Sequence, residues 1–253
     1  MLKAAEQEEA LPVTQLDPRC GLCAVRYGRK VCQNADGSAP EFCPTLRRTD
    51  TVERAVQAYL DPEVREFARQ ASIQEASCYT DRDRLPHVLR PVKTRLQETM
   101  EFARRMGYRR LGLAFCAGLA REAMTLQQIL EAQGFEVVSV ICKVGRVPKE
   151  FIGIREEEKV RIGGGPEAMC NPISQAAILN EAEVDFAILM GLCVGHDSLF
   201  LKHVDAPATV FAVKDRVLGH NPMAALYTAA SYYQKLSRCS LDAESGPHDS
   251  RDE

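Results

Sequence analysis

Four of the ten cysteines in this 253-residue chain lie close together near its N-terminus. They have the spacing C-x2-C-x8-C-x10-C, at Cys20, Cys23, Cys32 and Cys43. Thiolates are the ligands that zinc and iron–sulfur clusters share, and a C-x2-C pair lets one turn offer two sulfurs to the same centre. Pro44 after the last cysteine is typical of ferredoxins, although the spacings differ, whereas zinc knuckles usually have two short pairs. We therefore expect a metal centre here, a [4Fe–4S] cluster with zinc as the alternative.

A second set of four cysteines lies in the C-terminal part of the chain, next to predicted secondary structure. Three of them follow or close apolar runs and one precedes an Asn-Pro helix start: Cys116, Cys142, Cys193 and Cys170. In open α/β sheets, ligands bind beyond the carboxyl ends of the strands, so these cysteines are expected to line one site. The site could hold a second metal centre, again an iron–sulfur cluster. The alternative is that they are buried thiols that pack as small apolar residues.

Two histidines belong to the same predicted edge. His196 follows Cys193 by three residues, and His220 comes just after the last predicted strand. Cys193 with His196 as its base could form a nucleophilic pair, and either histidine could ligate a metal, transfer protons or cap a helix. The neighbouring residues 214–216 (KDR) could contact an anionic ligand or form a solvated turn.

The elements that must position these residues form a regular alternation from residue 94 onward. Four apolar runs are expected to be strands: Arg110–Phe115, Phe135–Cys142, Asp185–Met190 and Ala208–Lys214. Helices are expected between and around them: Thr94–Met106, Leu119–Gln133, Pro172–Ala182, His196–His203 and a last one from Asn221-Pro222 to about Leu236. Continuous apolar strands separated by helices predict a four-stranded, doubly wound parallel sheet in an α/β domain.

The rest of the chain completes the expected domain order. Residues 1–18 are predicted to be a flexible arm, 19–48 a cysteine-rich metal-binding lobe, 49–93 a helical segment, 94–238 the α/β domain and 239–253 a flexible tail. In the helical segment, Asp50 and Glu53 suggest a capping box, and Asp61-Pro62 starts a second helix that runs to about Ser77. Cys78 and Cys239 belong to neither cysteine set and are expected to be structural.

Composition limits the possible partners and compartment. The formal net charge of -3 and the pI near 6.0 offer no case for binding nucleic acid or an anionic membrane. The N-terminal residues are rich in glutamate and lack an apolar run, so we expect no secretory signal and a cytoplasmic protein with reduced thiols. A small-molecule substrate or a redox partner protein is expected, while the sequence does not indicate an oligomeric state.

Several motifs together resemble a known family. They are EFCPT at 41–45, Thr94-Arg95, GLAFCAGL at 112–119, EVVSVICK at 136–143, CNPI at 170–173, GLCVGHDSLF at 191–200 and KDRVLGHNP at 214–222. Over residues 19–236 the chain resembles uncharacterised metal-binding proteins of anaerobic bacteria and archaea, a domain of unknown function. The resemblance implies metal binding at the N-terminal cysteines and supplies no reaction. Many members have another cysteine soon after Cys142, where this chain has Val144 and Gly145.

Two four-thiolate sites in one chain predict a metal-binding, iron–sulfur protein with a role in electron transfer or in the reduction of a small molecule. One alternative is a non-catalytic binding module with a structural zinc site. The other is a thiol-dependent enzyme that uses Cys193 and His196, for which His220 is a further catalytic candidate.

Overall fold

The structure is a computed structural model that describes residues 17–237. The chain divides into two compact units, residues 1–73 and 74–253, and each unit is considered by itself. Most of the expected N-terminal arm, and the expected tail with Cys239, lie outside the described residues. No described helix is both long enough and apolar enough to cross a membrane.

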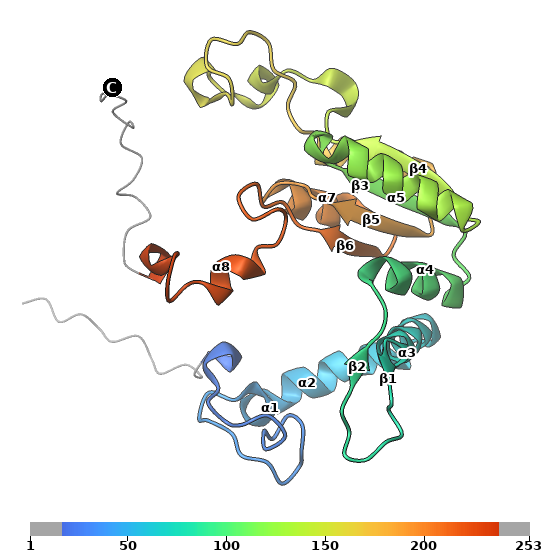
Figure 1. Cartoon of the computed structure of the whole chain (residues 1–253), viewed down its shortest axis with the longest axis vertical. Helices are drawn as coiled ribbons and strands as arrows, with labels where there is room; N and C mark the ends of the chain where they lie inside the picture. The colour runs from blue at the N-terminus through green and yellow to red at the C-terminus, as the bar shows by residue number, and fades with distance from the viewer. Residues whose placement is uncertain (1–16, 238–253) are drawn as a thin grey trace, which may run out of the picture. The chain divides into compact units, whose positions relative to one another are not determined.

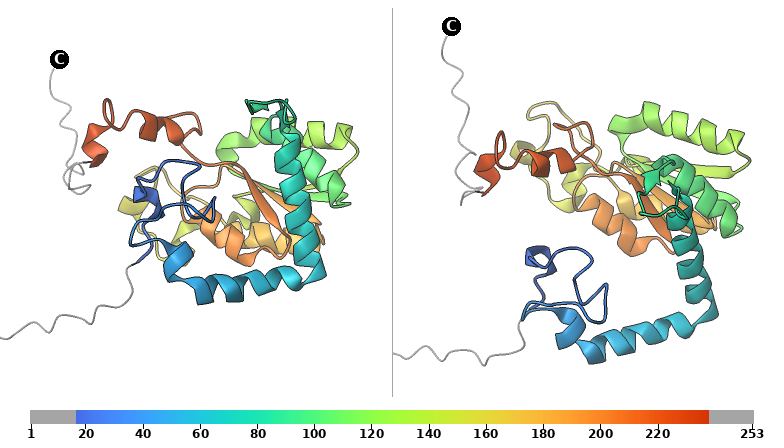
Figure 2. Two further views of the ribbon diagram at one scale, coloured as in Figure 1. Left: turned by 90° about the horizontal axis from the view of Figure 1, so that it is seen from below. Right: turned by 60° about the horizontal axis from the view of Figure 1, so that its bottom comes forward.

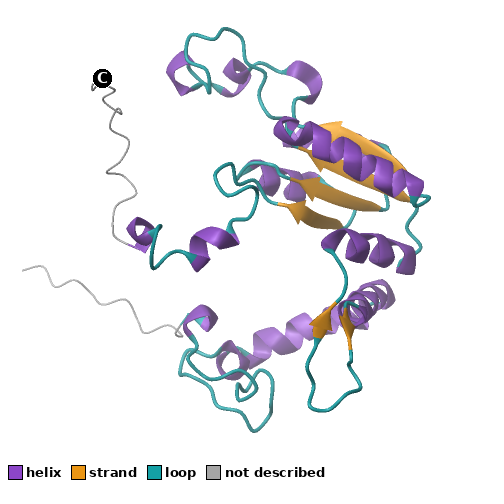
Figure 3. Cartoon of the chain, viewed as in Figure 1, coloured by secondary structure: helices purple, strands orange, loops and turns teal. Residues whose placement is uncertain are grey.

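The first unit consists of loops followed by helices (Figure 3). Its elements are η1 (Cys20–Leu22), α1 (Pro44–Arg47), α2 (Thr49–Val56), η2 (Gln57–Leu60) and most of α3 (Pro62–Ser77). The loop between the first and last cysteines is held by a bridge in which the backbone N–H of Val31 donates to the carbonyl of Ser38 at 3.0 Å. The four N-terminal cysteines therefore lie on a loop-rich segment that has little regular structure of its own.

One of the two predicted helix starts in this region is wrong and the other is confirmed. Only Arg48 separates α1 from α2, so α2 begins at Thr49, and Asp50 lies inside its first turn instead of capping it. The predicted capping box of Asp50 and Glu53 is therefore absent from α2. At α3 the carboxylate of Asp61 accepts the backbone N–H groups of the next turn at 2.8 and 3.1 Å, as expected for an N-cap.

The second unit is built on a four-stranded, fully parallel sheet (Figure 1). Its strands are β3 (Arg110–Phe115), β4 (Glu136–Ile141), β5 (Phe186–Met190) and β6 (Ala208–Ala212), in the spatial order β4-β3-β5-β6. Phe115 pairs with Ile141 on one side and with Met190 on the other, so the central strands end at the same level. This confirms the predicted α/β class and places the carboxyl ends of the strands along one edge.

Helices cover both faces of this sheet (Figures 1 and 2). They are α4 (Arg95–Arg105) and α5 (Ala120–Ala132) on one face, and α6 (Pro172–Glu181) and α7 (His196–His203) on the other. Phe102 of α4 packs on Phe186 of β5 with ring centroids 5.7 Å apart. On the opposite face, a Cβ added to Gly112 of β3 would lie 2.9 Å from the Leu179 side chain, so the glycine permits α6 to approach closely. The sheet is therefore the central layer of a three-layer unit.

Local capping signals explain where two of these helices begin. Thr94 and Gln97 form the predicted capping box at α4, and the side chain of Asn171 accepts the backbone N–H of Ser174 at the start of α6. The last predicted helix is largely wrong, because α8 spans only Met223–Tyr227, followed by turns and by η7 (Gln234–Ser237). None of the residues of α8 is buried, so the helix lacks the packed apolar face that stabilises short helices.

Two features of the second unit were not predicted. One is a small antiparallel ladder of β1 (Tyr79–Thr80) and β2 (Arg90–Pro91) before α4. The other is the fold of the β4–α6 connection, residues 142–171, which contains η4 (Val144–Arg146), η5 (Lys149–Ile152) and η6 (Glu156–Glu158). Its two ends pair antiparallel at Pro148 and Ala168. Its middle is held by the ammonium of Lys159, which forms ion pairs with the carboxylates of Glu150 and Glu156, each at 2.6 Å.

Candidate functional site

A cleft of about 880 Å³ lies at the carboxyl edge of the sheet. It is lined by all four cysteines of the second set and by His196, together with residues of the β4–α6 connection and the residues just after β6. The structure therefore brings together Cys116, Cys142, Cys170 and Cys193, which are spread over 78 positions of sequence.

Cys116 and Cys142 lie side by side because they follow the paired strand ends of β3 and β4. The backbone N–H of Cys142 donates to the carbonyl of Phe115 at 2.9 Å, which continues the parallel ladder by one residue. The two thiols are hydrogen bonded to each other, and the backbone N–H of Ala117 donates to the Cys142 sulfur at 3.3 Å. Neighbouring strands are about 4.8 Å apart, so these two sulfurs are close as a direct result of the sheet register.

Cys170 reaches the same place from the far end of the β4–α6 connection. The backbone N–H of Asn171 donates to the carbonyl of Cys142 at 2.7 Å and so ties the start of α6 to the end of β4. The Cys170 thiol is hydrogen bonded to Cys142 as well. Cys142 is therefore the middle member of a row of three sulfurs.

Cys193 lines the cleft outside this row. It lies three residues after the end of β5, and its carbonyl accepts the backbone N–H of His196 at the start of α7, at 2.9 Å. The guanidinium of Arg216 donates to the Cys193 sulfur at 3.0 Å. The described contacts thus pair the Cys193 thiol with an arginine, while His196 shares the cleft.

The environment separates the acidities of the three thiols in the row. The hydrogen bond from Cys142 lowers the pKa of Cys116, with further help from the backbone of Gly118 and from Lys214. The pKa of Cys170 is lowered first by Cys142 and then by Lys143 and His196. The pKa of Cys142 is raised by its two sulfur neighbours and by burial. The arrangement therefore favours thiolates at both ends of the row with a protonated thiol between them.

Basic side chains dominate the charged lining of the cleft. They are Lys143, Lys149, Arg161, Lys214 and Arg216, against the single carboxylate of Glu167. That carboxylate is paired with Lys149 at 2.6 Å. The remaining cations favour negative charge in the cleft, whether it belongs to thiolates or to a ligand.

His220 has a different place from the one expected. It does not line the cleft, and its Nδ1 accepts the backbone N–H of Asp215 at 3.1 Å. The backbone N–H of His220 donates to the carbonyl of Asp215 at 2.9 Å, and the φ of His220, 66°, lies in the left-handed region. In the structure His220 therefore closes the loop after β6.

Sequence reasoning missed the contribution of the β4–α6 connection to the cleft. Lys149, Ile152, Val160 and Arg161 all line the cleft, although they lie far from any predicted strand end. The charged run at 155–161 was visible in the sequence, but no periodicity indicated which way it would fold. The pairing of the ends of the connection, which brings its middle back to the sheet edge, is a tertiary feature.

The four N-terminal cysteines also gather in the structure. Cys20, Cys23, Cys32 and Cys43 all line one small cavity of about 70 Å³ in the first unit. Even so, the described residues contain no group of three or more His, Cys, Asp or Glu side chains already arranged to hold a metal ion. Both cysteine sets are thus assembled as neighbours, and all nine described cysteines are free thiols.

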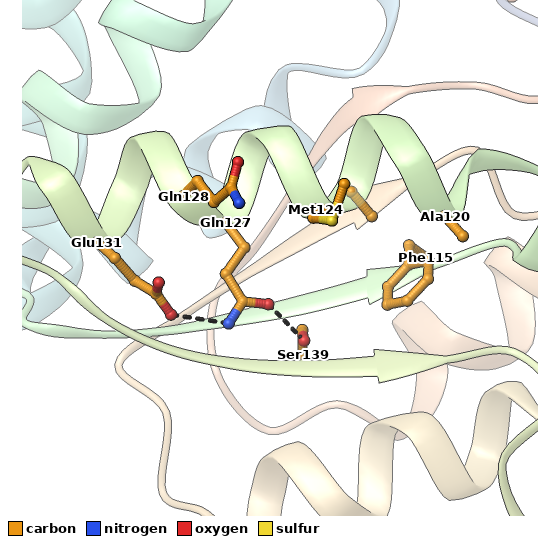
Figure 4. Close-up of a pocket in the computed structure, with 8 residues that line it drawn as sticks. Phe115, Ala120, Met124, Gln127, Gln128, Glu131 and Ser139 are labelled. Atoms are coloured by element: carbon orange, nitrogen blue, oxygen red, sulfur yellow. Dashed lines mark hydrogen bonds between the residues drawn. The ribbon is translucent and has the colours of Figure 1, made fainter.

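A further cavity of about 340 Å³ lies between α5 and β4 (Figure 4). There the Gln127 side chain bridges the two elements, donating to Glu131 and accepting from Ser139, each at 2.7 Å. Its lining holds neither a cysteine nor a basic side chain. The cleft at the sheet edge is therefore the stronger candidate for chemistry.

Comparison with known proteins identifies relatives but no activity. The family described as "Protein of unknown function (DUF1847)" matches residues 43–211, a range that contains all four cysteines of the cleft. An uncharacterized protein of Methanocaldococcus jannaschii is 43% identical over 188 residues, which cover 74% of this chain and 88% of the relative. The predicted resemblance to an uncharacterised family is confirmed, and neither description mentions a metal.

Proposed function

We propose that this chain, which belongs to the DUF1847 family, is an iron–sulfur redox protein whose reactive centre lies in the cleft at the sheet edge. One observation carries the proposal. Three strand ends and one helix start each bring a cysteine, Cys116, Cys142, Cys193 and Cys170, to the same cleft. Four thiols from four separate segments form the kind of ligand set that a [4Fe–4S] cluster requires.

The chemistry of the cleft fits a thiolate-ligated, anionic group. Lys143 and Lys214 lie near the sulfurs at the two ends of the row, where positive charge stabilises thiolates. The N–H of Ala117 already donates to one sulfur, and hydrogen bonds of this kind tune the potential of such centres. A cluster holds its ligand sulfurs farther apart than a single ion does, so binding one would break the hydrogen bonds among Cys116, Cys142 and Cys170 and spread the three sulfurs. When bound, a cluster would supply one-electron transfer.

Arg216 has a defined part in this proposal. Its guanidinium donates to the Cys193 sulfur, the one thiol outside the hydrogen-bonded row. Here it would hold Cys193 at the wall of the cleft and offset the negative charge of a thiolate there. The electrons would pass to a small-molecule substrate in the cleft or to a redox partner protein.

The N-terminal cysteines form the second metal site of the proposal. They share one cavity within a loop-rich segment, where thiolate–metal bonds could supply the stability that a core supplies elsewhere. A [4Fe–4S] cluster and zinc remain the two candidates for this site. A reducing, cytoplasmic setting goes with both sites and is supported by the free thiols of the described cysteines.

Anaerobic purification with iron, sulfide and zinc analysis and an ultraviolet–visible spectrum tests the proposal. We expect iron and sulfide in the native protein, with a loss of one cluster's worth in Cys116→Ser and in Cys193→Ser. Cys78→Ser is the matched control, because Cys78 is buried, lies outside both sets and bonds the carbonyl of Gln74 at 3.1 Å. A colourless protein that holds only zinc would refute the redox proposal and favour a binding module with a structural zinc site.

A metal-free thiol enzyme is the second candidate, and the contact between Cys116 and Cys142 favours it. Cys116 and Cys142 directly follow the last residue pair of β3 and β4, and neighbouring strands are about 4.8 Å apart, a separation that a disulfide can span. The Cys116 thiolate would attack one sulfur of an organic disulfide, forming a mixed disulfide and releasing one thiolate. Cys142 would then displace the second thiol, so that the substrate gains two electrons and a Cys116–Cys142 disulfide forms.

Alkylation distinguishes this candidate from the sequence-based alternative of Cys193 with His196. In reduced, metal-free protein, brief iodoacetamide treatment followed by peptide mass spectrometry should label Cys116 or Cys170 before Cys193 if the row of thiols reacts. Preferential labelling of Cys193 would favour the pair with His196 instead.

A further inference from the structure

We infer that the cleft binds a small amphipathic organic anion, with its charged group among the basic side chains and its apolar part against the β4–α6 connection. The inference deepens the proposed function and rests on it only for the position of the functional site. It does not depend on whether the cysteines hold a metal.

Uncompensated positive charge is the first observation. After Lys149 and Glu167 are paired, four cations line the cleft without a carboxylate partner in its wall: Lys143, Arg161, Lys214 and Arg216. The guanidinium of Arg161 makes no hydrogen bond or ion pair with any residue between 17 and 237. Four cations without a carboxylate partner in the wall of the cleft favour an anionic ligand.

These cations come from two separate segments of the chain. Lys143 and Arg161 belong to the β4–α6 connection, whereas Lys214 and Arg216 follow β6. The Lys214 ammonium lies 3.2 Å from the point where Gly118 would carry a Cβ, so a larger residue there would crowd it away from Cys116. Both segments line the same cleft, so each contributes positive charge to one site.

Apolar exposure is the second, independent observation. Ile152 and Val160 both line the cleft, yet 58% and 85% of their surfaces are exposed. Ile154, Pro166 and Met169 extend the same apolar wall. A volume of about 880 Å³ lies within the range of small-molecule sites, which combine an apolar lining with a few charged groups. Inorganic phosphate would leave this wall uncovered, so an anion with an apolar body fits better.

Two fluorescent dyes of nearly equal shape test the inference: anilinonaphthalene sulfonate, which is anionic, and the uncharged phenylnaphthylamine. Each is titrated into the purified full-length protein, and iron is measured in the same samples. We expect the sulfonate to bind more tightly. Arg161→Gln should weaken binding of the sulfonate about fivefold, because it removes one partly exposed charge interaction. It should leave the affinity for the uncharged dye unchanged. Lys202→Gln, which removes an exposed lysine of α7 outside the cleft, is the matched control.

The apolar wall is tested by Val160→Ser, with Val88→Ser as the control at an exposed valine outside the cleft. The Val160 substitution should weaken the binding of both dyes. In a competition experiment, octanoate should displace the bound sulfonate and inorganic phosphate should not. Equal binding of the two dyes, equal effects of Arg161→Gln and Lys202→Gln, or equal effects of the two valine substitutions would overturn the inference. So would displacement by phosphate as effective as by octanoate. An iron-free protein with the expected dye pattern would support this inference and refute the proposed function. An iron-loaded protein without that pattern would support the proposed function and refute this inference.

Discussion

Gln175 provides a quantitative test of what holds the ends of β3 and β4 together beneath the thiols. Its side chain is completely buried on α6, and its Nε2 donates to the carbonyls of Val140 at 2.7 Å and Phe115 at 3.2 Å. Its Oε1 is buried with no hydrogen-bond partner among the described residues. Two buried hydrogen bonds contribute about 1–3 kcal/mol, and an unsatisfied buried oxygen costs about 1–3 kcal/mol. The polar contributions of the amide should therefore nearly cancel.

Two substitutions separate hydrogen bonding from packing at this position. Gln175→Met keeps most of the volume and removes both the donor and the unpartnered oxygen, so the free energy of unfolding should change by less than ~1 kcal/mol. Gln175→Ala leaves a cavity between α6 and the sheet and should cost ~2–4 kcal/mol. Reversible urea unfolding followed by circular dichroism measures both values, and Gln175→Ala should lower Tm by ~5–15 °C.

The methionine variant decides whether this reasoning holds. If Gln175→Met loses more than ~2 kcal/mol, the hydrogen bonds outweigh the cost of the oxygen, and the cancellation is wrong. A buried water that satisfies Oε1 would produce that result. Leu179→Ala, one turn along α6 and also fully buried, is a control for cavity cost without any polar change.

Four further predictions concern other parts of the molecule. Gly191→Ala should destabilise the second unit by ~2 kcal/mol or more in thermal unfolding, because φ is 64° and the new Cβ would lie 2.2 Å from a leucine side chain. Gly163→Ala is the control, since Gly163 also has a positive φ but open space around it, and it should cost only ~1 kcal/mol of stability. Lys159→Met should make the β4–α6 connection the first site of cleavage in limited proteolysis, whereas equal resistance would mean that its ion pairs do not hold it. Because Lys159 lowers the pKa of its two glutamate partners below the usual 4.5, their ion pairs stabilise the connection fully above that pH. This contribution is lost as the pH falls through the lowered pKa values, which hydrogen exchange at low pH would detect. Chelation of metal, or Cys32→Ser, should unfold the first unit and leave the sheet intact by circular dichroism, and an unchanged first unit would refute a stabilising metal there.

The fold was predictable wherever a local signal and burial point the same way. β3 begins and ends where its apolar run does, and α4 starts at the capping box of Thr94 because its hydrogen bonds involve only the residues of one turn. Asp61 and Asn171 start their helices for the same reason. α8 was overpredicted, because helix-forming residues there have no apolar partner surface to pack against.

The candidate site was predictable only in part. Strand ends are local features, and in a parallel sheet they share an edge, so Cys116, Cys142 and Cys193 could be expected to lie together. The basic and apolar wall could not, because its position depends on ion pairs such as that between Lys149 and Glu167, which join residues 18 positions apart. His220 shows the opposite error, since its place in sequence after β6 suggested the cleft but its ring instead accepts a backbone N–H of its own loop.

The paired ends of the β4–α6 connection have a consequence for how this protein family could diversify. Val147 and Met169, and likewise Lys149 and Glu167, are joined by backbone hydrogen bonds of 2.8 and 2.9 Å, so the chain leaves and re-enters the sheet edge at nearly the same point. Residues 150–166 could then be shortened, lengthened or exchanged while the strands and the thiols keep their places. Such a segment could be replaced as a unit. New ligand preferences could then arise while the rest of the fold stays the same.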